Sequence, residues 1–204
     1  AKDDQIEVYG YLVLLEDHVI LIDTGIGDDS SKVEMLFRPR RRSISELLAK
    51  HEVHTTDVST VINSHLHFDH CGNNRLFPDA EIFVQSSEVA AARQPKYTIV
   101  DWFDYEGARL NEISGDAEIL PGIRAIASPG HTPGHQSVLI EDSLRPKLIA
   151  AQAAYSTTEY ETGGDISQAF EGMELAYTET IARLKSLEAS EVCFSHDHRT
   201  AHSS

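Results

Sequence analysis

The chain has 204 residues and a formal net charge of −16, which comes from 33 acidic and 17 basic residues. This length suffices for one sizeable core and favours a single domain over residues 1–204. The negative charge argues against a nucleic-acid partner, and the apolar runs are too short to cross a membrane. The composition is that of a soluble globular protein.

Cysteine usage favours a reducing compartment. Cys71 and Cys193 are the only cysteines in the sequence, too few for a disulfide framework. Residues 1–5 carry no apolar signal segment, although the lack of an initiating Met leaves a trimmed leader open. We therefore expect a cytoplasmic location.

The first half of the chain alternates strand and helix signals. Residues 6–15 and 18–22 are apolar and rich in β-branched side chains, which predicts an antiparallel hairpin. A capping box that begins at Ser43, followed by apolar residues at helical spacing, predicts a helix to about residue 51. The basic run at 38–42 is expected to be a solvated flank of this helix, with contact to an anion or substrate as the alternative.

Most of the remaining predicted elements are strands, bounded by turn signals such as Pro121-Gly122. They cover residues 58–63, 81–85, 117–120, 123–127, 136–140, 147–151 and 191–194. Apolar residues recur at the helical period from Met173 to Leu187, which predicts a long amphipathic helix. Paired hairpins, each followed by strand and helix, predict an α/β fold, a four-layer αββα sandwich of two sheets with helices outside.

The densest chemical signal is the segment His-Leu-His-Phe-Asp-His, which directly follows a predicted strand. A loop after a strand can turn alternate side chains toward one point, and imidazole and carboxylate groups are ligands that Zn²⁺ prefers. Leu66 and Phe68, which alternate with these groups, would point into the core. Packing does not explain such density, so the segment predicts a metal site. Its candidate ligands are His65, His67, Asp69 and His70.

Two further histidines follow predicted strands. His131 lies in a loop rich in Pro and Gly, and His196 comes directly after the strand 191–194. A metal site assembled from strand-end loops needs this placement. His135 and His198 lie in the same turns, and we interpret both as residues that do not bind the metal.

This pattern resembles that of the metallo-β-lactamase superfamily, in which His-x-His-x-Asp-His precedes two later histidines. The resemblance covers nearly the whole chain and implies two divalent metal ions, with Zn²⁺ as the expected metal. It implies that the first ion is bound by His65, His67 and His131 and the second by Asp69, His70 and His196. Asp23 matches a position that supports the site from behind, with a turn-forming role as the alternative.

Within the superfamily the chain resembles N-acyl-homoserine lactonases, through residues 64–70, residues 129–137 and Ala154-Tyr155-Ser156. In those enzymes a tyrosine at the position of Tyr155 contacts the substrate carbonyl oxygen. Gln152 departs from the pattern, because the lactonases carry there an aspartate that bridges the two ions. An amide brings no charge to two dications, so the resemblance implies weaker binding of the second ion.

The function implied by the resemblance is hydrolysis of an N-acyl-homoserine lactone-like ring. Two bound ions would lower the pKa of water toward about 7 and give a metal-bound hydroxide. Asp69 would orient this nucleophile, and Tyr155 would donate to the developing oxyanion. Gln152 keeps two alternatives open: hydrolysis of a β-lactam or a thioester, the latter as in glyoxalase II, or a catalytically weak homologue that binds metal.

The expected partner is a small-molecule ester or lactone, and we expect neither nucleic acid nor a membrane as partner. Trp102, Phe103 and Tyr105 form an aromatic group that is expected to pack under a loop, with an acyl pocket as the alternative. The sequence leaves the oligomeric state and the acyl chain open.

Overall fold

The computed structural model describes residues 6–142 and 145–202. The expectation that residues 1–5 form no signal segment therefore lies outside the described residues. Contacts divide the chain into two compact units, and the single domain over 1–204 stays a prediction. The N-terminal unit comprises Gly10–Val84 and Val89–Glu112, and the described residues of the C-terminal unit are 6–9, 85–88, 113–142 and 145–202.

The sheet that begins in the N-terminal unit has, among the described residues, five strands in the order β1-β2-β3-β4-β5. Its strands are β1 (Tyr11–Leu14), β2 (Val19–Ile22), β3 (Thr60–Ile62), β4 (Glu81–Gln85) and β5 (Arg109–Ile113). The predicted hairpin is confirmed, since β1 and β2 pair antiparallel, whereas β2, β3 and β4 are parallel. The carboxyl ends of β2 and β3 consequently lie at one edge of the sheet.

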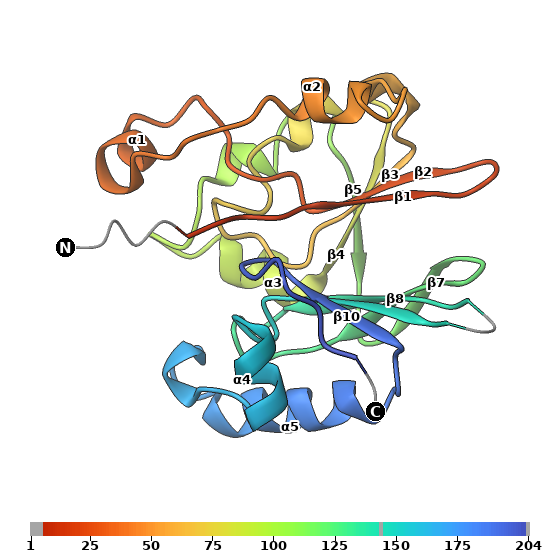
Figure 1. The fold of residues 1–204 in the computed structure, drawn as a ribbon. Helices are drawn as coiled ribbons and strands as arrows, with labels where there is room; N and C mark the ends of the chain where they lie inside the picture. Colours follow the sequence, from red (N-terminus) through yellow and green to blue (C-terminus); the bar gives the residue numbers. More distant parts are fainter. Residues whose placement is uncertain (1–5, 143–144, 203–204) are drawn as a thin grey trace. The chain divides into compact units, whose positions relative to one another are not determined.

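The helices of this region are short. They are α1 (Ser31–Phe37), α2 (Ile44–Ala49), α3 (Ser86–Ala92), η1 (Thr55–Asp57), η2 (Asn74–Leu76) and η3 (Val100–Trp102). The predicted start of α2 is confirmed, because the Ser43 hydroxyl accepts a hydrogen bond from the Glu46 backbone N–H at 3.3 Å. Leu48 of α2 belongs to a buried apolar cluster with Leu21 and Val61 of the sheet, and Figure 1 shows α2 beside β2 and β3.

The basic run before α2 is anchored in part to the protein. Arg41 donates from Nε to the Gly27 carbonyl at 2.9 Å and forms an ion pair with Glu34 of α1. Arg38, Arg40 and Arg42 are exposed. The expected solvated flank is thus confirmed for these three residues but is wrong for Arg41.

The sheet of the C-terminal unit has, in the described part of the chain, five strands in the order β10-β9-β8-β7-β6. They are β6 (Ala117–Leu120), β7 (Ile123–Ala127), β8 (Gln136–Ile140), β9 (Lys147–Ala151) and β10 (Glu191–Phe194), all at the predicted positions. Neighbouring strands are antiparallel except β9 and β10, which are parallel. The carboxyl ends of β9 and β10 therefore lie side by side.

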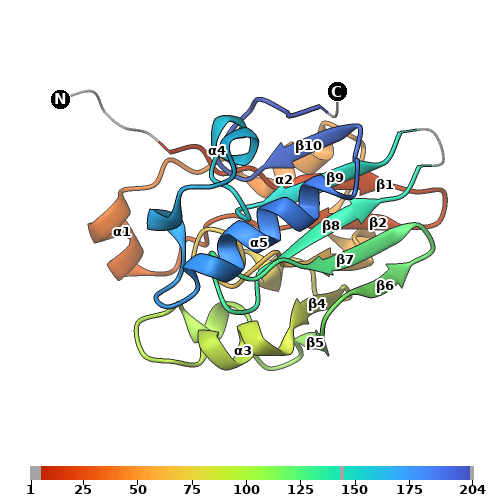
Figure 2. The same cartoon turned by 90° about the horizontal axis from the view of Figure 1, so that it is seen from below.

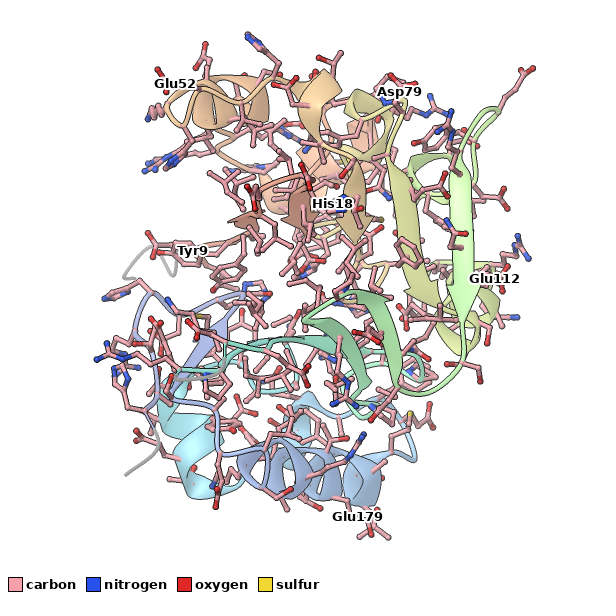
Figure 3. All side chains as sticks on the ribbon, turned by 90° about the vertical axis from the view of Figure 1, so that its right-hand side faces the viewer. Tyr9, His18, Glu52, Asp79, Glu112 and Glu179 are labelled. Carbon is pink, nitrogen blue, oxygen red and sulfur yellow. The ribbon has the colours of Figure 1, made fainter. Side chains whose placement is uncertain are left out.

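Three helical segments complete the C-terminal unit: α4 (Thr157–Thr162), η4 (Ile166–Gln168) and α5 (Glu174–Lys185). The predicted amphipathic helix is confirmed as α5, which lies across one face of the sheet (Figure 2). Tyr177, Ile181 and Leu184 recur on one side of α5 and are buried against the sheet. Figure 3 shows Glu179 on the opposite side of α5, where it is exposed.

The predicted α/β class, with helices packed on two sheets, is confirmed. Cys71 and Cys193 are both free, as expected from their number. Burial raises the pKa of Cys193 to about 11, so this thiol is unreactive near neutral pH. Among the described residues, no helix has both the length and the apolar character that crossing a lipid bilayer requires.

Candidate metal centre

The segment that holds the histidine motif begins directly after β3. Its apolar residues point inward as predicted: Leu66 is fully buried, and Phe68 packs against the same apolar cluster. The polar residues between them are therefore turned to the other side of the loop. Among these, His65 with His67 and Asp69 with His70 offer two pairs of candidate ligand atoms.

The ring nitrogens of His65 and His67 approach each other as ligands of one ion would. His65 Nε2 lies 3.1 Å from His67 Nδ1, and the two rings are nearly perpendicular. For a tetrahedral zinc site with metal–nitrogen distances of about 2.0 Å, two ligand nitrogens are about 3.3 Å apart. Because the observed separation matches this spacing, the pair fits a divalent ion without rearrangement.

Asp69 and His70 form the second pair of this loop. One carboxylate oxygen of Asp69 lies 3.5 Å from His70 Nε2. Burial lowers the pKa of His70, but the carboxylates of Asp69 and Asp23 outweigh it and raise the value to about 10. In the metal-free protein these two carboxylates therefore stabilise a cation at His70. The same two carboxylates would stabilise a bound divalent cation, so the residues fit a metal ion in their charge as well as in their spacing.

Asp23 holds the histidine loop from behind, as expected from the resemblance. It is buried directly after β2 with a φ of 60°, in the left-handed region that aspartate adopts more readily than most residues other than glycine. Its Oδ1 accepts from the Ser64 backbone N–H at 2.7 Å. Its Oδ2 accepts from the Ser64 hydroxyl at 2.7 Å and from His70 Nδ1 at 2.8 Å.

These bonds determine which ring nitrogens carry protons. His70 Nδ1 donates to Asp23, so the neutral ring that would bind an ion carries its lone pair on Nε2. The Ser64 hydroxyl gives its only proton to Asp23, so it must accept from His65 Nδ1, which lies 3.0 Å away. His65 consequently carries its lone pair on Nε2 as well. This role of Ser64 was not predicted from the sequence, since a serine in a loop gives no signal of it.

A buried amide network lies under the same loop. Asn74 Nδ2 donates to Asn63 Oδ1 at 2.8 Å, and Asn63 Nδ2 donates to the His70 carbonyl at 3.3 Å. The Thr24 hydroxyl donates to Asn74 Oδ1 at 2.8 Å. These bonds fix the backbone at His70 independently of any metal.

His131 lies in the loop between β7 and β8 of the C-terminal unit. Its Nδ1 is 3.2 Å from the Gln168 carbonyl, which can only accept, so the Nε2 atom carries the lone pair. The buried Glu88 carboxylate holds the same loop, because it accepts from the Thr132 hydroxyl at 2.7 Å and from the Gly134 N–H at 3.1 Å. This role of Glu88 was not predicted from the sequence.

His196 follows β10, and its neighbours fix its ring. Its Nδ1 lies 2.8 Å from the Glu7 carbonyl, so here too Nε2 carries the lone pair. The ring stacks on the Tyr155 ring, with 4.6 Å between centroids and 21° between planes. The C-terminal unit therefore brings together Tyr155 and His196, two of the predicted site residues.

His135 differs from the proposed ligands in using both ring nitrogens within the protein. Its Nδ1 donates to the Ser128 carbonyl at 3.2 Å, and its Nε2 accepts from the Gln152 backbone N–H at 3.2 Å. His198 is 74% exposed. Both observations agree with the interpretation of these two histidines as residues that do not bind the metal.

Gln152 follows Ala151, which ends β9 with a left-handed φ of 52°. The side chain is largely buried, with 8% of Gln152 exposed. Its role at the bridging position stays a prediction. So does the gathering of all six proposed ligands around two ions, because the histidine loop belongs to one unit and His131 and His196 to the other.

The aromatic group around Trp102 belongs to the core. Trp102 and Phe103 are 1% and 0% exposed and pack in the apolar cluster that contains Leu66. Tyr105 packs against a second apolar cluster that contains Val61. The expected packing role is confirmed, and the alternative of an acyl pocket is wrong for Trp102 and Phe103, since a fully buried ring cannot contact a substrate.

Comparison with known proteins agrees with this site. The profile of the metallo-beta-lactamase superfamily matches residues 4–196. An N-acyl homoserine lactonase from a Bacillus species is 34% identical over 206 residues, which cover 93% of this chain and 81% of that protein. The N-acyl homoserine lactonase AiiA from Bacillus thuringiensis subsp. kurstaki is 32% identical over 210 residues, with the same shares covered.

The solved structures include an N-acyl homoserine lactone hydrolase with its product, N-hexanoyl-L-homoserine, bound at the catalytic metal centre. It matches this fold with a TM-score of 0.82 and 29% identity, over 95% of this chain and 82% of that chain. The metallo-β-lactamase fold predicted from the sequence is thereby confirmed. Since the superfamily profile covers most of the chain and a curated relative is 34% identical to it, this protein belongs to the metallo-β-lactamase superfamily.

Proposed function

We propose that this protein is a metal-dependent hydrolase that opens the ring of N-acyl-homoserine lactones. The observation that carries the proposal is a shared hydrogen-bond pattern at four of the predicted histidine ligands. In each of them Nδ1 is bound to an oxygen atom of the protein, which leaves Nε2 to act as the ligand atom. The four are His65, His70, His131 and His196.

The proposed ligand sets follow the superfamily pattern. One ion would be held by His65, His67 and His131, and the other by Asp69, His70 and His196. We propose zinc, because imidazole nitrogens and a carboxylate oxygen suit this borderline ion and its tetrahedral geometry. When bound, the two ions supply a nucleophile at neutral pH and polarise the substrate carbonyl.

The chain's own residues would orient the reaction. Asp69 is positioned beside His70 and can accept a hydrogen bond from the attacking water, which aligns that water. Tyr155 would donate its hydroxyl proton in a hydrogen bond to the carbonyl oxygen on which negative charge develops. Its stacking on His196 limits rotation of the ring, so the hydroxyl is positioned before the substrate binds.

Apolar side chains near the histidine loop favour a substrate with an acyl tail. Phe37 of α1 stacks on Phe68 at 4.3 Å between ring centroids, and Phe68 directly precedes Asp69. Phe37 and Met35 are 56% and 71% exposed. We propose that these exposed apolar groups contact the acyl chain.

Gln152 supports a second candidate function. If its amide replaces the bridging carboxylate, the second ion would be held less tightly, because an amide brings no charge to the two dications. We therefore retain hydrolysis of a β-lactam or a thioester as the alternative, and a catalytically weak metal-binding homologue as a third.

A substrate panel tests the proposal. The protein would be stripped of metal, reloaded with zinc, and assayed by proton release with N-hexanoyl- and N-decanoyl-homoserine lactone, a β-lactam and a thioester. We expect metal-dependent turnover of both lactones that exceeds turnover of the other two compounds. His67→Ala should abolish it, whereas His198→Ala, which changes an exposed histidine, should not. Faster hydrolysis of the β-lactam or thioester would favour the alternative, and metal binding without any turnover would contradict an enzymatic role.

A further inference from the structure

Glu159 lies at the centre of a hydrogen-bond cluster in the C-terminal unit. One carboxylate oxygen, Oε2, accepts from the Tyr155 backbone N–H at 2.7 Å. The other, Oε1, accepts from the Asp165 backbone N–H at 3.1 Å and from the Tyr177 hydroxyl. One side chain thus joins the segment before α4, the segment after α4, and α5.

The local sequence explains why Glu159 reaches Tyr155. Ser156 caps α4, since its hydroxyl accepts from the Glu159 backbone N–H at 3.2 Å. In a capping box the glutamate of the first turn bonds back to the N–H of the cap residue itself. Here the carboxylate instead binds the N–H of Tyr155, one residue earlier. The capping arrangement therefore fixes the backbone of the proposed catalytic tyrosine.

Tyr177 connects the same carboxylate to the loop of His131. A Cβ atom at Gly130 would lie 2.5 Å from the Tyr177 Cα, so the backbone just before His131 packs directly on α5. Thr180 of α5 donates to the Pro129 carbonyl at 2.6 Å. Burial, and then the neighbouring Glu159, raise the pKa of Tyr177, so its hydroxyl stays protonated and donates.

We propose that Glu159 is a positioning residue: it fixes the backbone at Tyr155 and, through Tyr177, ties it to the loop that carries His131. The inference rests on the proposed function, in which the Tyr155 hydroxyl contacts the substrate. Glu159 itself contacts no substrate in this proposal. It holds the tyrosine at a constant distance from a proposed ligand loop, which a reaction sensitive to displacements of about 1 Å requires.

Replacement of Glu159 by glutamine breaks this arrangement with little change in shape. A carboxylate accepts all three donors, whereas an amide has one acceptor oxygen and two N–H donors. The Tyr177 hydroxyl can rotate and accept, but the backbone N–H groups of Tyr155 and Asp165 cannot. These two N–H groups face different carboxylate oxygens. Either orientation of the glutamine amide therefore places its NH₂ group against one of the two backbone N–H donors.

A double-mutant cycle with Tyr155→Phe separates positioning from general stability. In the zinc-loaded protein, Glu159→Gln should lower kcat for N-hexanoyl-homoserine lactone about 10-fold, as expected for loss of a hydrogen bond to a charged group. The KM should change much less. In the Tyr155→Phe background, Glu159→Gln should lower kcat by less than about twofold, because no hydroxyl remains to be positioned.

A second readout does not depend on activity. Hydrogen exchange of the Tyr155 amide should be faster in Glu159→Gln, since its carboxylate acceptor is lost. Glu161→Gln, which alters an exposed glutamate of the same helix, serves as the matched control and should change neither readout. If Glu159→Gln does not fold, Tyr177→Phe takes its place in the double-mutant cycle, because it removes one donor to the Glu159 carboxylate. The same non-additivity is then expected.

Two results would overturn the inference. One is an equal loss of kcat from Glu159→Gln with and without the Tyr155 hydroxyl, which would indicate a structural role only. The other is an unchanged rate of Tyr155 amide exchange. If the unmodified protein opens no lactone, the proposed function fails, and amide exchange alone decides whether Glu159 holds Tyr155.

Discussion

Replacement of Asp23 by asparagine should weaken metal binding although Asp23 is not a proposed ligand. The carboxylate accepts three hydrogen bonds, two from Ser64 and one from His70. If the asparagine oxygen keeps the hydrogen bond from the Ser64 backbone N–H, the asparagine NH₂ group faces His70 Nδ1. His70 can then accept only if its own proton moves to Nε2, which removes the lone pair proposed to bind the ion.

The expected magnitude follows from these contacts. Residues that support a metal ligand commonly change metal affinity about 10- to 100-fold. We expect the upper end of this range for the ion at His70, because His70 bonds directly to Asp23. The affinity for the ion at His65 should fall less, because the intervening Ser64 hydroxyl can rotate and still accept a hydrogen bond from His65.

Competition with a chromophoric chelator would measure both affinities, with Asp79→Asn as the control at an exposed aspartate. If Asp23→Asn bound both ions as tightly as the unmodified protein, the hydrogen bonds of Asp23 would have no role in metal binding. A larger loss at the ion of His65 than at the ion of His70 would contradict the expected order of the two losses.

The metal-free protein offers an independent check of the same interaction. The pKa of His70 is raised from 6.5 to about 10, so protonation of His70 stabilises the fold fully below pH 6.5. This contribution is lost as the pH rises toward 10. Asp23→Asn removes one of the two carboxylates that raise the pKa, so the free energy of unfolding should change less over this range in chemical denaturation.

Three further substitutions test the proposed site. Tyr155→Phe should leave metal content unchanged and lower lactone turnover by at most roughly 100- to 1,000-fold, the cost of losing one oxyanion donor. Gln152→Asp should bind the second ion at least about 10-fold more tightly and raise turnover at limiting metal, since it adds a charge between two dications. Phe37→Ala should raise the KM for the decanoyl lactone more than for the hexanoyl lactone, by up to about 10-fold, because apolar contact with the longer chain is lost.

Each of these expectations has a distinct contrary result. Unchanged turnover in Tyr155→Phe would make the tyrosine a packing residue. Unchanged affinity in Gln152→Asp would mean that residue 152 does not lie at the bridging position. Equal changes in KM for both chain lengths would place the acyl chain away from Phe37.

The strands were predictable because their signals are local. Short β-rich runs bounded by turn residues gave the limits of β4 and of β6 to β10. The sequence did not predict α1, where Met35, Leu36 and Phe37 are three consecutive exposed apolar residues without a helical period. Nor did it predict β5, because Arg109–Ile113 lacks a buried face and shows no clear alternation.

Only those site residues whose type itself indicates metal binding were predictable from the sequence. The spacing of His65, His67, Asp69 and His70 identifies ligands directly, because few other functions need such density. Ser64 and Glu159 act through contacts with residues that the fold brings to them, Asp23 for Ser64 and Tyr177 for Glu159, and neither is itself a predicted metal ligand. Their roles depend on backbone geometry, which residue type does not encode.

The position of Asp23 has a consequence for the order in which metals bind. Its Oδ2 atom serves His70 directly and His65 through Ser64, so residues proposed for two different ions share one acceptor. An ion on His70 would make the His70 Nδ1 proton more acidic and draw electron density from Asp23. The Asp23 carboxylate would then be a weaker acceptor for the Ser64 hydroxyl, which is bonded in turn to His65. By linkage the effect is reciprocal. The two ions should accordingly bind in separate steps of unequal affinity, even apart from their mutual repulsion.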